Sequence, residues 1–289
     1  MINNTSYRNS GDFTRKLIKA SRPHHWEIML VPVIIAVLYP ANSIDMVLTS
    51  TTLWFFFYFS VPANLYVWGI NDIFDADDDV YNQRKDEDSL ELLFSGDTSI
   101  AVAIVGAGLL IGTGALFVTS PIALQVLVLC AVVPLLYSAP PLRLKRIPFI
   151  DSLVNGTFIL PAVAAYVAVD GSLPPLPAIA GFWLWFSGLH ALAAIIDIES
   201  DRQAGTSTIA TYLGERNTLV YCSCLWTVTC ILFAQIHILG GIIFLIFPLI
   251  GVYTIFSDAG PSVILSNMLL INLAVYVPIL IGGIWTIIS

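Results

Sequence analysis

Residues 51–79 read TTLWFFFYFSVPANLYVWGINDIFDADDD, an apolar run that ends in a cluster of acids. No charged side chain precedes Asp72 in this run, and a helix needs about 20 predominantly apolar residues to cross a bilayer. Ionisable groups at the end of such a helix are costly to place, and they commonly mark a functional site. The stretch therefore predicts a membrane-spanning helix with a site at its end.

The composition of the whole chain supports this assignment. Of the 289 residues, 57% are hydrophobic and 11% are charged, and the mean hydropathy is +0.84. A soluble domain carries roughly 45–50% apolar and about 25% charged residues, so lipid must solvate much of this surface. The net charge of −8 argues against nucleic acid as a partner. The sequence predicts an integral membrane protein in contact with a lipid bilayer.

Apolar runs of similar length recur along the chain. Each run is continuous rather than alternating, which favours helices and excludes a β-barrel. The predicted spans are nine, at residues 26–45, 51–72, 98–117, 121–138, 150–168, 176–197, 218–236, 240–257 and 264–287. Residues 1–21 form a polar, basic N-terminal segment, and residues 22–289 form a single transmembrane domain.

The basic residues indicate the orientation. With nine spans, the twelve Lys and Arg residues fall before the first span and in the loops after the second, fourth and sixth spans, all on one side. Arg84 and Lys85 belong to this set, whereas the opposite loop at residues 169–175 has neither residue type. Lys and Arg mark the cytoplasmic side. We therefore expect an all-α bundle in the cell (plasma) membrane, with the N-terminus in the cytoplasm and the C-terminus outside.

Two acidic clusters end apolar spans on that side. If the helix continues past residue 72, a turn of about 100° per residue brings Asn71, Asp72, Asp75 and Asp79 into one arc. The second cluster, DIESD at residues 197–201, places Asp197 and Asp201 on one helix face. Carboxylates this close repel one another unless a cation holds them, and carboxylate oxygens suit Mg²⁺. The alternative for either cluster is a solvated helix end.

A basic loop lies between the two clusters in the sequence. Residues 137–146 read YSAPPLRLKR and contribute Tyr137, Arg143 and Lys145 beside the predicted metal site. Cations next to bound metal ions would select an anion such as a diphosphate. Basic residues in a cytoplasmic loop also follow from the positive-inside rule alone, and the same alternative applies to Arg22. His190, within the sixth span, is expected to be a neutral, hydrogen-bonded core residue.

The three motifs in this order resemble those of the UbiA superfamily of intramembrane prenyltransferases. The resemblance runs from about residue 22 to about residue 214, and it implies that two Mg²⁺ ions bind an isoprenyl diphosphate. The metal ligands that it implies are Asp75, Asp79, Asp197 and Asp201, assisted by Asp72. The diphosphate contacts that it implies are Arg22, Asn71, Tyr137, Arg143 and Lys145. One departure is Ser207, which stands where many members have a Lys.

Three further stretches are similar to the lycopene elongases within this family. They are GINDIFD at residues 69–75, RIPFIDSL at residues 146–153 and STIAT at residues 207–211. The resemblance implies transfer of a five-carbon unit from dimethylallyl diphosphate to the ends of lycopene. Another lipophilic acceptor, such as a quinone precursor, a glycerol phosphate ether or a chlorophyllide, remains an alternative. A cation transporter is a more distant one, because it would place charges near the middle of the membrane.

Overall fold

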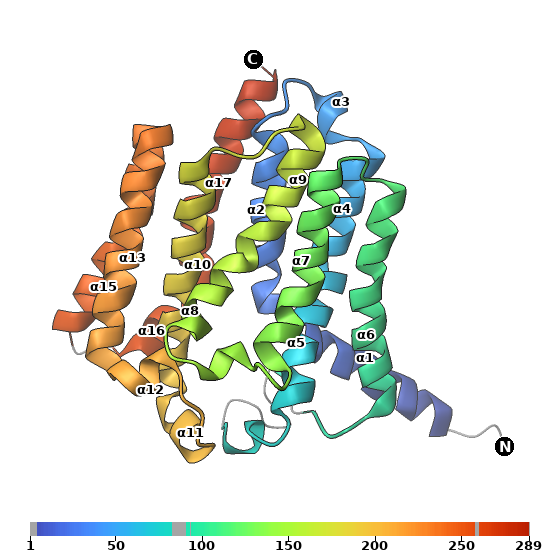
Figure 1. The fold of residues 1–289 in the computed structure, drawn as a ribbon, viewed down its shortest axis with the longest axis vertical. Coiled ribbons are helices and arrows are strands. Elements are labelled where there is room, and N and C mark those ends of the chain that lie inside the picture. Colours follow the sequence, from blue (N-terminus) through green and yellow to red (C-terminus); the bar gives the residue numbers. More distant parts are fainter. Residues whose placement is uncertain (1–4, 83–90, 93, 258–259, 289) are drawn as a thin grey trace.

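The computed structural model describes residues 5–82, 91–92, 94–257 and 260–288, and these residues fold mainly into helices (Figure 1). Arg84 and Lys85, which the topology argument used, lie outside the described residues. The α-helices are α1 (Thr5–Ser21), α2 (Trp26–Leu38), α3 (Ile44–Val47), α4 (Ser50–Ser60), α5 (Pro62–Asp75), α6 (Thr98–Leu109), α7 (Pro121–Ser138), α8 (Ile150–Asn155), α9 (Leu160–Asp170), α10 (Leu176–Ile196), α11 (Ile198–Gln203), α12 (Ile209–Leu213), α13 (Glu215–Ile236), α14 (Ile238–Phe244), α15 (Ile246–Phe256), α16 (Pro261–Ser266) and α17 (Met268–Ile288). The short 3-10 turns are η1 (Pro23–His25), η2 (Asp79–Tyr81), η3 (Leu110–Leu116), η4 (Leu144–Arg146) and η5 (Gly156–Ile159).

Eight helical stretches of the described chain are long and apolar enough to cross a membrane. They are Ser50–Asp75, Thr98–Leu116, Pro121–Ser138, Ile150–Asp170, Leu176–Ile196, Glu215–Ile236, Ile238–Phe256 and Met268–Trp285. The first predicted span corresponds to α2, which has only 13 residues because the helix stops at Leu38, just before Pro40. The all-helical architecture is thus confirmed, whereas the count of nine spans and the orientation in the membrane stay predictions.

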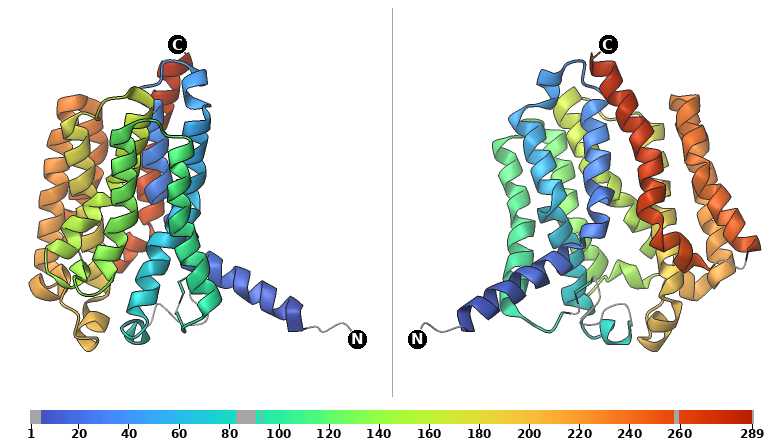
Figure 2. Two further views of the ribbon diagram at one scale, coloured as in Figure 1. Left: turned by 45° about the vertical axis from the view of Figure 1, so that its right-hand side comes forward. Right: turned by 180° about the vertical axis from the view of Figure 1, so that it is seen from behind.

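The two acidic clusters lie at one end of the bundle. Figure 1 shows the end of α5 and the short α11 at this end, together with the N-terminus, while the C-terminus lies at the opposite end. The N-terminal helix α1 packs against α5 and α6, and Figure 2 shows it projecting sideways beyond the bundle. Phe13 and Leu17 of α1 pack against a buried cluster that includes Tyr66 and Ile70. The clusters, though separated in sequence, therefore share one end of the molecule.

The helices of the second half pack around large aromatic side chains. Trp185, Trp226 and Phe247 are almost completely buried, and the Trp185 and Phe247 ring centroids lie 5.3 Å apart. On the outside of the bundle, large apolar residues such as Phe256 and Trp285 are exposed. This distribution is that of a bundle whose core is filled by aromatic packing and whose outer surface meets lipid.

Two glycines allow α10 and α13 to approach closely. A Cβ added at Gly188 would lie 2.4 Å from Nε1 of Trp226, and one added at Gly181 would lie 2.6 Å from the Phe233 ring. Nε1 of Trp226 also donates a hydrogen bond to the carbonyl of Trp185 at 3.2 Å. Small residues at these two positions, two helical turns apart, are therefore required for the contact that positions α10.

Replacing Gly188 by Ala should lower the melting temperature of the protein in detergent. The added methyl group displaces the Trp226 indole, and overpacking of this kind costs about 1–3 kcal/mol. Gly106→Ala is the matched control, because a Cβ added there has no atom within 4 Å and Ala favours helix over Gly. Equal melting temperatures for the two variants would contradict the close-packing argument.

Candidate active site

The first acidic motif spans the end of α5 and the turn that follows. The helix ends at Asp75, and Asp79 begins the separate turn η2. The expectation of one continuous helix through Asp79 was therefore wrong. Its physical reason is local: Asp is a poor helix former, and successive carboxylates at a helix C-terminus oppose the negative end of the helix dipole. The fold nevertheless brings Asp75 and Asp79 to the same cavity.

The second acidic motif keeps its helical spacing. Asp197 links α10 to α11, and the Asp201 amide donates to the Asp197 carbonyl at 2.8 Å. Thr208 donates to the Asp201 carboxylate at 3.2 Å. Helix α11 contacts η2, so the two motifs are neighbours in space. Asp151 adds a buried anchor by accepting a hydrogen bond from the Ile209 amide at 2.8 Å, which holds the segment after the motif.

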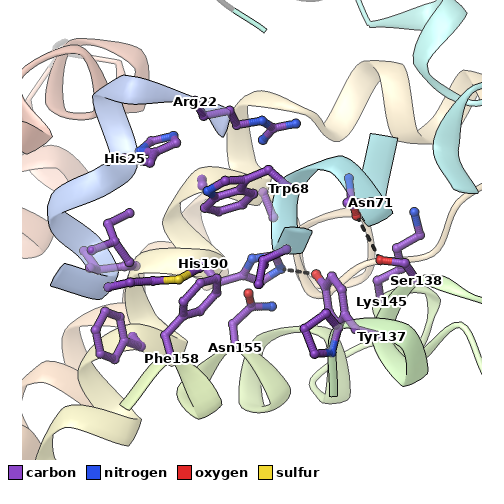
Figure 3. A pocket seen from close by; sticks show the side chains of 18 of the residues that line it. Arg22, His25, Trp68, Asn71, Tyr137, Ser138, Lys145, Asn155, Phe158 and His190 are labelled. Carbon is purple, nitrogen blue, oxygen red and sulfur yellow. Dashed lines mark hydrogen bonds between the residues drawn. The ribbon is translucent and has the colours of Figure 1, made fainter. Parts of the chain in front are cut away.

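A cavity of about 800 Å³ extends inward from the two motifs. Most of the predicted site residues line it, and several are labelled in Figure 3. Those that line it are Arg22, Asn71, Asp75, Asp79, Tyr137, Lys145, Asp197 and Asp201. Asp72 and Arg143 are not among the lining residues. The predicted metal and diphosphate residues are thus brought together, and those two contact lining residues, Asp72 through Arg22 and Arg143 through Asp75.

Asp72 and Arg22 form a buried ion pair. A guanidinium nitrogen of Arg22 lies 2.9 Å from Oδ1 of Asp72, whose side chain is fully buried. The same nitrogen lies 3.3 Å from Glu91. The guanidinium also lies over the Trp68 ring, 4.9 Å from its centroid, which is within the range of a cation–π contact. Asp72 therefore holds Arg22 at the edge of the cavity.

The basic loop pairs with the first acidic motif. Lys145 forms an ion pair with Asp75, and Arg146 forms one with Asp78. Arg143 adopts a left-handed backbone conformation, with φ at 39°, and donates to the Phe74 carbonyl at 2.5 Å. Each loop cation thus contacts the end of α5 or the residues just after it. The loop supplies positive charge beside the carboxylates, as expected for a site that binds an anion.

The site has hard oxygen donors suited to Mg²⁺. The four predicted ligands Asp75, Asp79, Asp197 and Asp201 all line the cavity, and Mg²⁺ commonly uses one or two carboxylates together with substrate phosphates. Within the described residues, no three His, Cys, Asp or Glu side chains converge closely enough to hold an ion by themselves. Carboxylates of this kind fit a metal ion that a bound phosphate helps to coordinate.

The electrostatic environment of the second motif agrees with a cation site. Burial, together with the neighbouring charge of Asp197, raises the pKa of Asp201 to about 7. A carboxyl group in this environment gains from a nearby cation, because the positive charge favours its ionised form. The donor set and the charge balance therefore both fit a divalent cation.

Aromatic and polar side chains form the inner wall. The Trp68 ring lies between His25 and Phe158, with centroid distances of 5.4 and 5.7 Å. Asn64 is buried behind this wall and accepts a hydrogen bond from the Trp68 indole at 3.1 Å. Figure 3 shows Trp68 on the Arg22 side of the cavity. The wall near the charged end is thus an aromatic surface whose orientation is set by a buried amide.

His190 lies on the cavity wall rather than in the packed core. The Tyr137 hydroxyl and Nε2 of His190 are 3.2 Å apart, and Ser138 donates to Oδ1 of Asn71 at 3.3 Å (Figure 3). The expectation of a hydrogen-bonded histidine holds, but its position beside the cavity was missed. The sequence feature that could have indicated this position is the spacing of His190 from Asp197, which is seven residues or two turns along the same helix face.

Sequence reasoning also missed a polar pair deeper in the cavity. Glu27 of α2 and Asn272 of α17 both line it, and Nδ2 of Asn272 donates to Oε1 of Glu27 at 3.5 Å. The sequence feature that could have indicated this pair is the presence of a charged residue, Glu27, and an amide residue, Asn272, inside apolar segments. Ser207, in contrast, is exposed and is not a lining residue, whereas its neighbours Thr206 and Thr208 line the cavity.

Comparisons with known proteins identify the family of this chain. Residues 29–287 match the UbiA prenyltransferase family. A lycopene elongase/hydratase of Haloferax volcanii is 37% identical over 279 residues, covering 96% of this chain and 92% of that protein. One of Haloarcula japonica is 40% identical over 232 residues, covering 80% of this chain and 78% of that protein.

Solved structures share the fold. A UbiA homologue from Archaeoglobus fulgidus, in a structure bound to dimethylallyl diphosphate and Mg²⁺, superposes with a TM-score of 0.71 at 20% identity. The match covers 94% of this chain and 99% of that one. With its apolar helices and its acidic cavity, the chain therefore belongs to the UbiA prenyltransferase family, as a multi-pass membrane enzyme.

Proposed function

We propose that this enzyme transfers the five-carbon group of dimethylallyl diphosphate to the ends of lycopene, with Mg²⁺ as cofactor. The observation that carries the proposal is the polarity of one cavity: carboxylates and cations gather at its outer end, and aromatic and apolar residues form much of its inner wall. Residues 22–289 form the prenyltransferase domain, with residues 1–21 as a separate basic segment. The charged end faces the cytoplasm of a cell (plasma) membrane crossed nine times.

The diphosphate would bind at the charged end. Arg22 and Lys145 line the cavity there and provide charge-assisted hydrogen bonds, with Tyr137 and Asn71 beside them. Arg143 does not line the cavity but lies 3.7 Å from Asp75. Asp75, Asp79, Asp197 and Asp201, assisted by Asp72, would hold Mg²⁺, which supplies positive charge to the departing diphosphate. Two of these carboxylates are paired with the same cations, Asp72 with Arg22 and Asp75 with Lys145.

The inner wall suits an allylic carbocation and an apolar acceptor. Departure of diphosphate leaves a dimethylallyl cation, and water must be kept from it until the acceptor alkene attacks. The π faces of Trp68 and Phe158 can stabilise this cation and are held side by side at 5.7 Å. Apolar residues such as Leu189 and Phe186 extend the cavity inward. A long hydrocarbon acceptor would contact these apolar side chains.

The relatives support the choice of substrates. The Haloferax and Haloarcula relatives are named for lycopene elongation and hydration, and their similarity extends over most of both chains. The Archaeoglobus structure carries dimethylallyl diphosphate and Mg²⁺ in the same fold. Together, these similarities favour lycopene over acceptors that carry a polar head.

Purified protein in lipid vesicles, given dimethylallyl diphosphate, lycopene and Mg²⁺, should form carotenoids longer than lycopene by one and two prenyl units. Chromatography with mass spectrometry measures the products, and EDTA should stop their formation because the carboxylates alone cannot neutralise the leaving group. Vesicles without lycopene are the control. If lycopene is left unchanged while a quinone precursor or a glycerol phosphate ether is prenylated, the acceptor assignment is wrong.

Asp75→Asn and Asp197→Asn should each lower the turnover rate by at least about 100-fold, because each removes a charged oxygen from the site that stabilises the leaving group. The rate of diphosphate release measures the effect, and the elution profile in detergent checks the fold. Asp45→Asn is the matched control, since Asp45 is exposed in α3 at the opposite end of the bundle (Figure 1). Near-normal rates in both site variants would refute the metal-site assignment.

A further inference from the structure

A second polar group lies in the cavity, apart from the two acidic motifs. Glu27 stands in the first turn of α2, and Asn272 is fully buried in α17. The two helices pack side by side, as Figure 2 shows, and the Asn272 amide donates to the Glu27 carboxylate at 3.5 Å. Both residues line the cavity that also reaches Asp75 and Asp197. One continuous space therefore joins two sites of different chemistry.

This group has hydrogen-bonding capacity that the protein leaves unused. Oδ1 of Asn272 and the hydroxyl of Tyr276 are buried, and neither has a hydrogen-bond partner among the described residues. Tyr276 follows Asn272 by one helical turn, so the two lie on one face of α17. Buried polar atoms are nearly always paired with protein or ordered water. A small polar ligand is therefore expected here.

Interhelical adhesion is the simpler explanation for such a group. Polar side chains do join helices within membranes, and the bond between Glu27 and Asn272 could serve that purpose alone. Adhesion does not account for an Asn oxygen and a Tyr hydroxyl on one face of α17 that are buried without partners among the described residues. It also does not account for a carboxylate on the wall of a cavity. A water molecule needs two to four polar partners, and Glu27, Asn272 and Tyr276 provide three.

We propose that Glu27, Asn272 and Tyr276 hold the water molecule that ends the reaction by hydration. The proposal rests on the prenyl transfer proposed above. Attack of the acceptor's terminal trisubstituted alkene on the dimethylallyl carbon forms one carbon–carbon bond, and diphosphate departs with the electron pair of the carbon–oxygen bond. The acceptor is left as a tertiary carbocation. The water oxygen donates an electron pair to this carbon, and Glu27 accepts the proton that the water loses, so that the product is a tertiary alcohol.

The position of the group suits this order of events. Water near the departing diphosphate would quench the dimethylallyl cation, so a hydrating water must be held elsewhere in the cavity. Glu27 lies in the first turn of α2, where the helix dipole favours the negative charge that a proton acceptor requires. Water that donates to Glu27 and Asn272 and accepts from Tyr276 keeps one lone pair for the carbocation.

The test measures how each enzyme partitions its product. Wild-type protein and the variants Glu27→Gln, Asn272→Leu and Tyr276→Phe are assayed in vesicles with dimethylallyl diphosphate, lycopene and Mg²⁺ in ¹⁸O-labelled water. The readout is the ratio of ¹⁸O-labelled alcohol to non-hydroxylated product, counted per diphosphate released. Glu215→Gln is the matched control, because Glu215 stands in the first turn of α13 but is exposed and is not a lining residue.

We expect Glu27→Gln to lower this ratio by roughly 100-fold or more, the scale of a general base. The carbocation then loses a proton to the departed diphosphate and yields an alkene. Asn272→Leu and Tyr276→Phe should lower the ratio to a smaller extent, and Glu215→Gln should leave it unchanged. Tyr276→Phe removes only one oxygen and therefore tests the site with little disturbance of packing.

Three outcomes would overturn the proposal, and they separate it from the proposed function. A wild-type ratio in Glu27→Gln and Tyr276→Phe, with prenyl transfer intact, refutes the water site alone. Wild-type protein that prenylates lycopene but incorporates no ¹⁸O also refutes the water site alone. Wild-type protein that prenylates another acceptor and leaves lycopene untouched refutes the proposed function, and the hydration step with it.

Discussion

Charge compensation at the helix ends is the constraint on which this structure depends. An apolar bundle offers little water to carboxylates that emerge from its helices, and a buried charge is tolerated only beside a partner of opposite sign. Arg22 meets Asp72 from the junction of α1 and α2, and Lys145 meets Asp75 from the loop after α7. These pairs connect three separate segments around the cavity mouth. The same ion pairs thus assemble the site and offset the cost of burying its charges in a membrane protein.

The rigidity of the site comes from the bundle beneath it. Helix α10 carries His190 on the cavity wall and ends at the second acidic motif. Its packing against α13 depends on close approach at Gly188, where the Trp226 indole fills the space of an absent side chain. Reacting groups must be held within a fraction of an ångström of their productive geometry. Aromatic packing far from the charges therefore contributes to the precision of the charged end.

The cavity is lined by two polar groups and by aromatic and apolar side chains. The outer region has the carboxylates and cations suited to a diphosphate, and the inner one has Glu27 and Asn272. Trp68 and Phe158 provide aromatic surface on the wall. Such an arrangement would allow the carbocation to form away from water and then to react with one bound water molecule. Each polar group would act at a defined place in the cavity.

The sequence by itself predicted that lipid contacts much of the surface, that the chain is helical and that it belongs to this family. It also predicted most residues that line the charged end of the cavity, because hydropathy and motif spacing are local properties of the chain. Only the tertiary structure decided that α5 ends at Asp75 with Asp79 in a turn of its own, and that Asp72 is buried and pairs with Arg22 of the cavity wall. It alone joined Glu27 to Asn272 across 245 positions of sequence. The physical reason is that helical periodicity relates residues a turn or two apart, whereas contacts between helices depend on how the whole bundle packs.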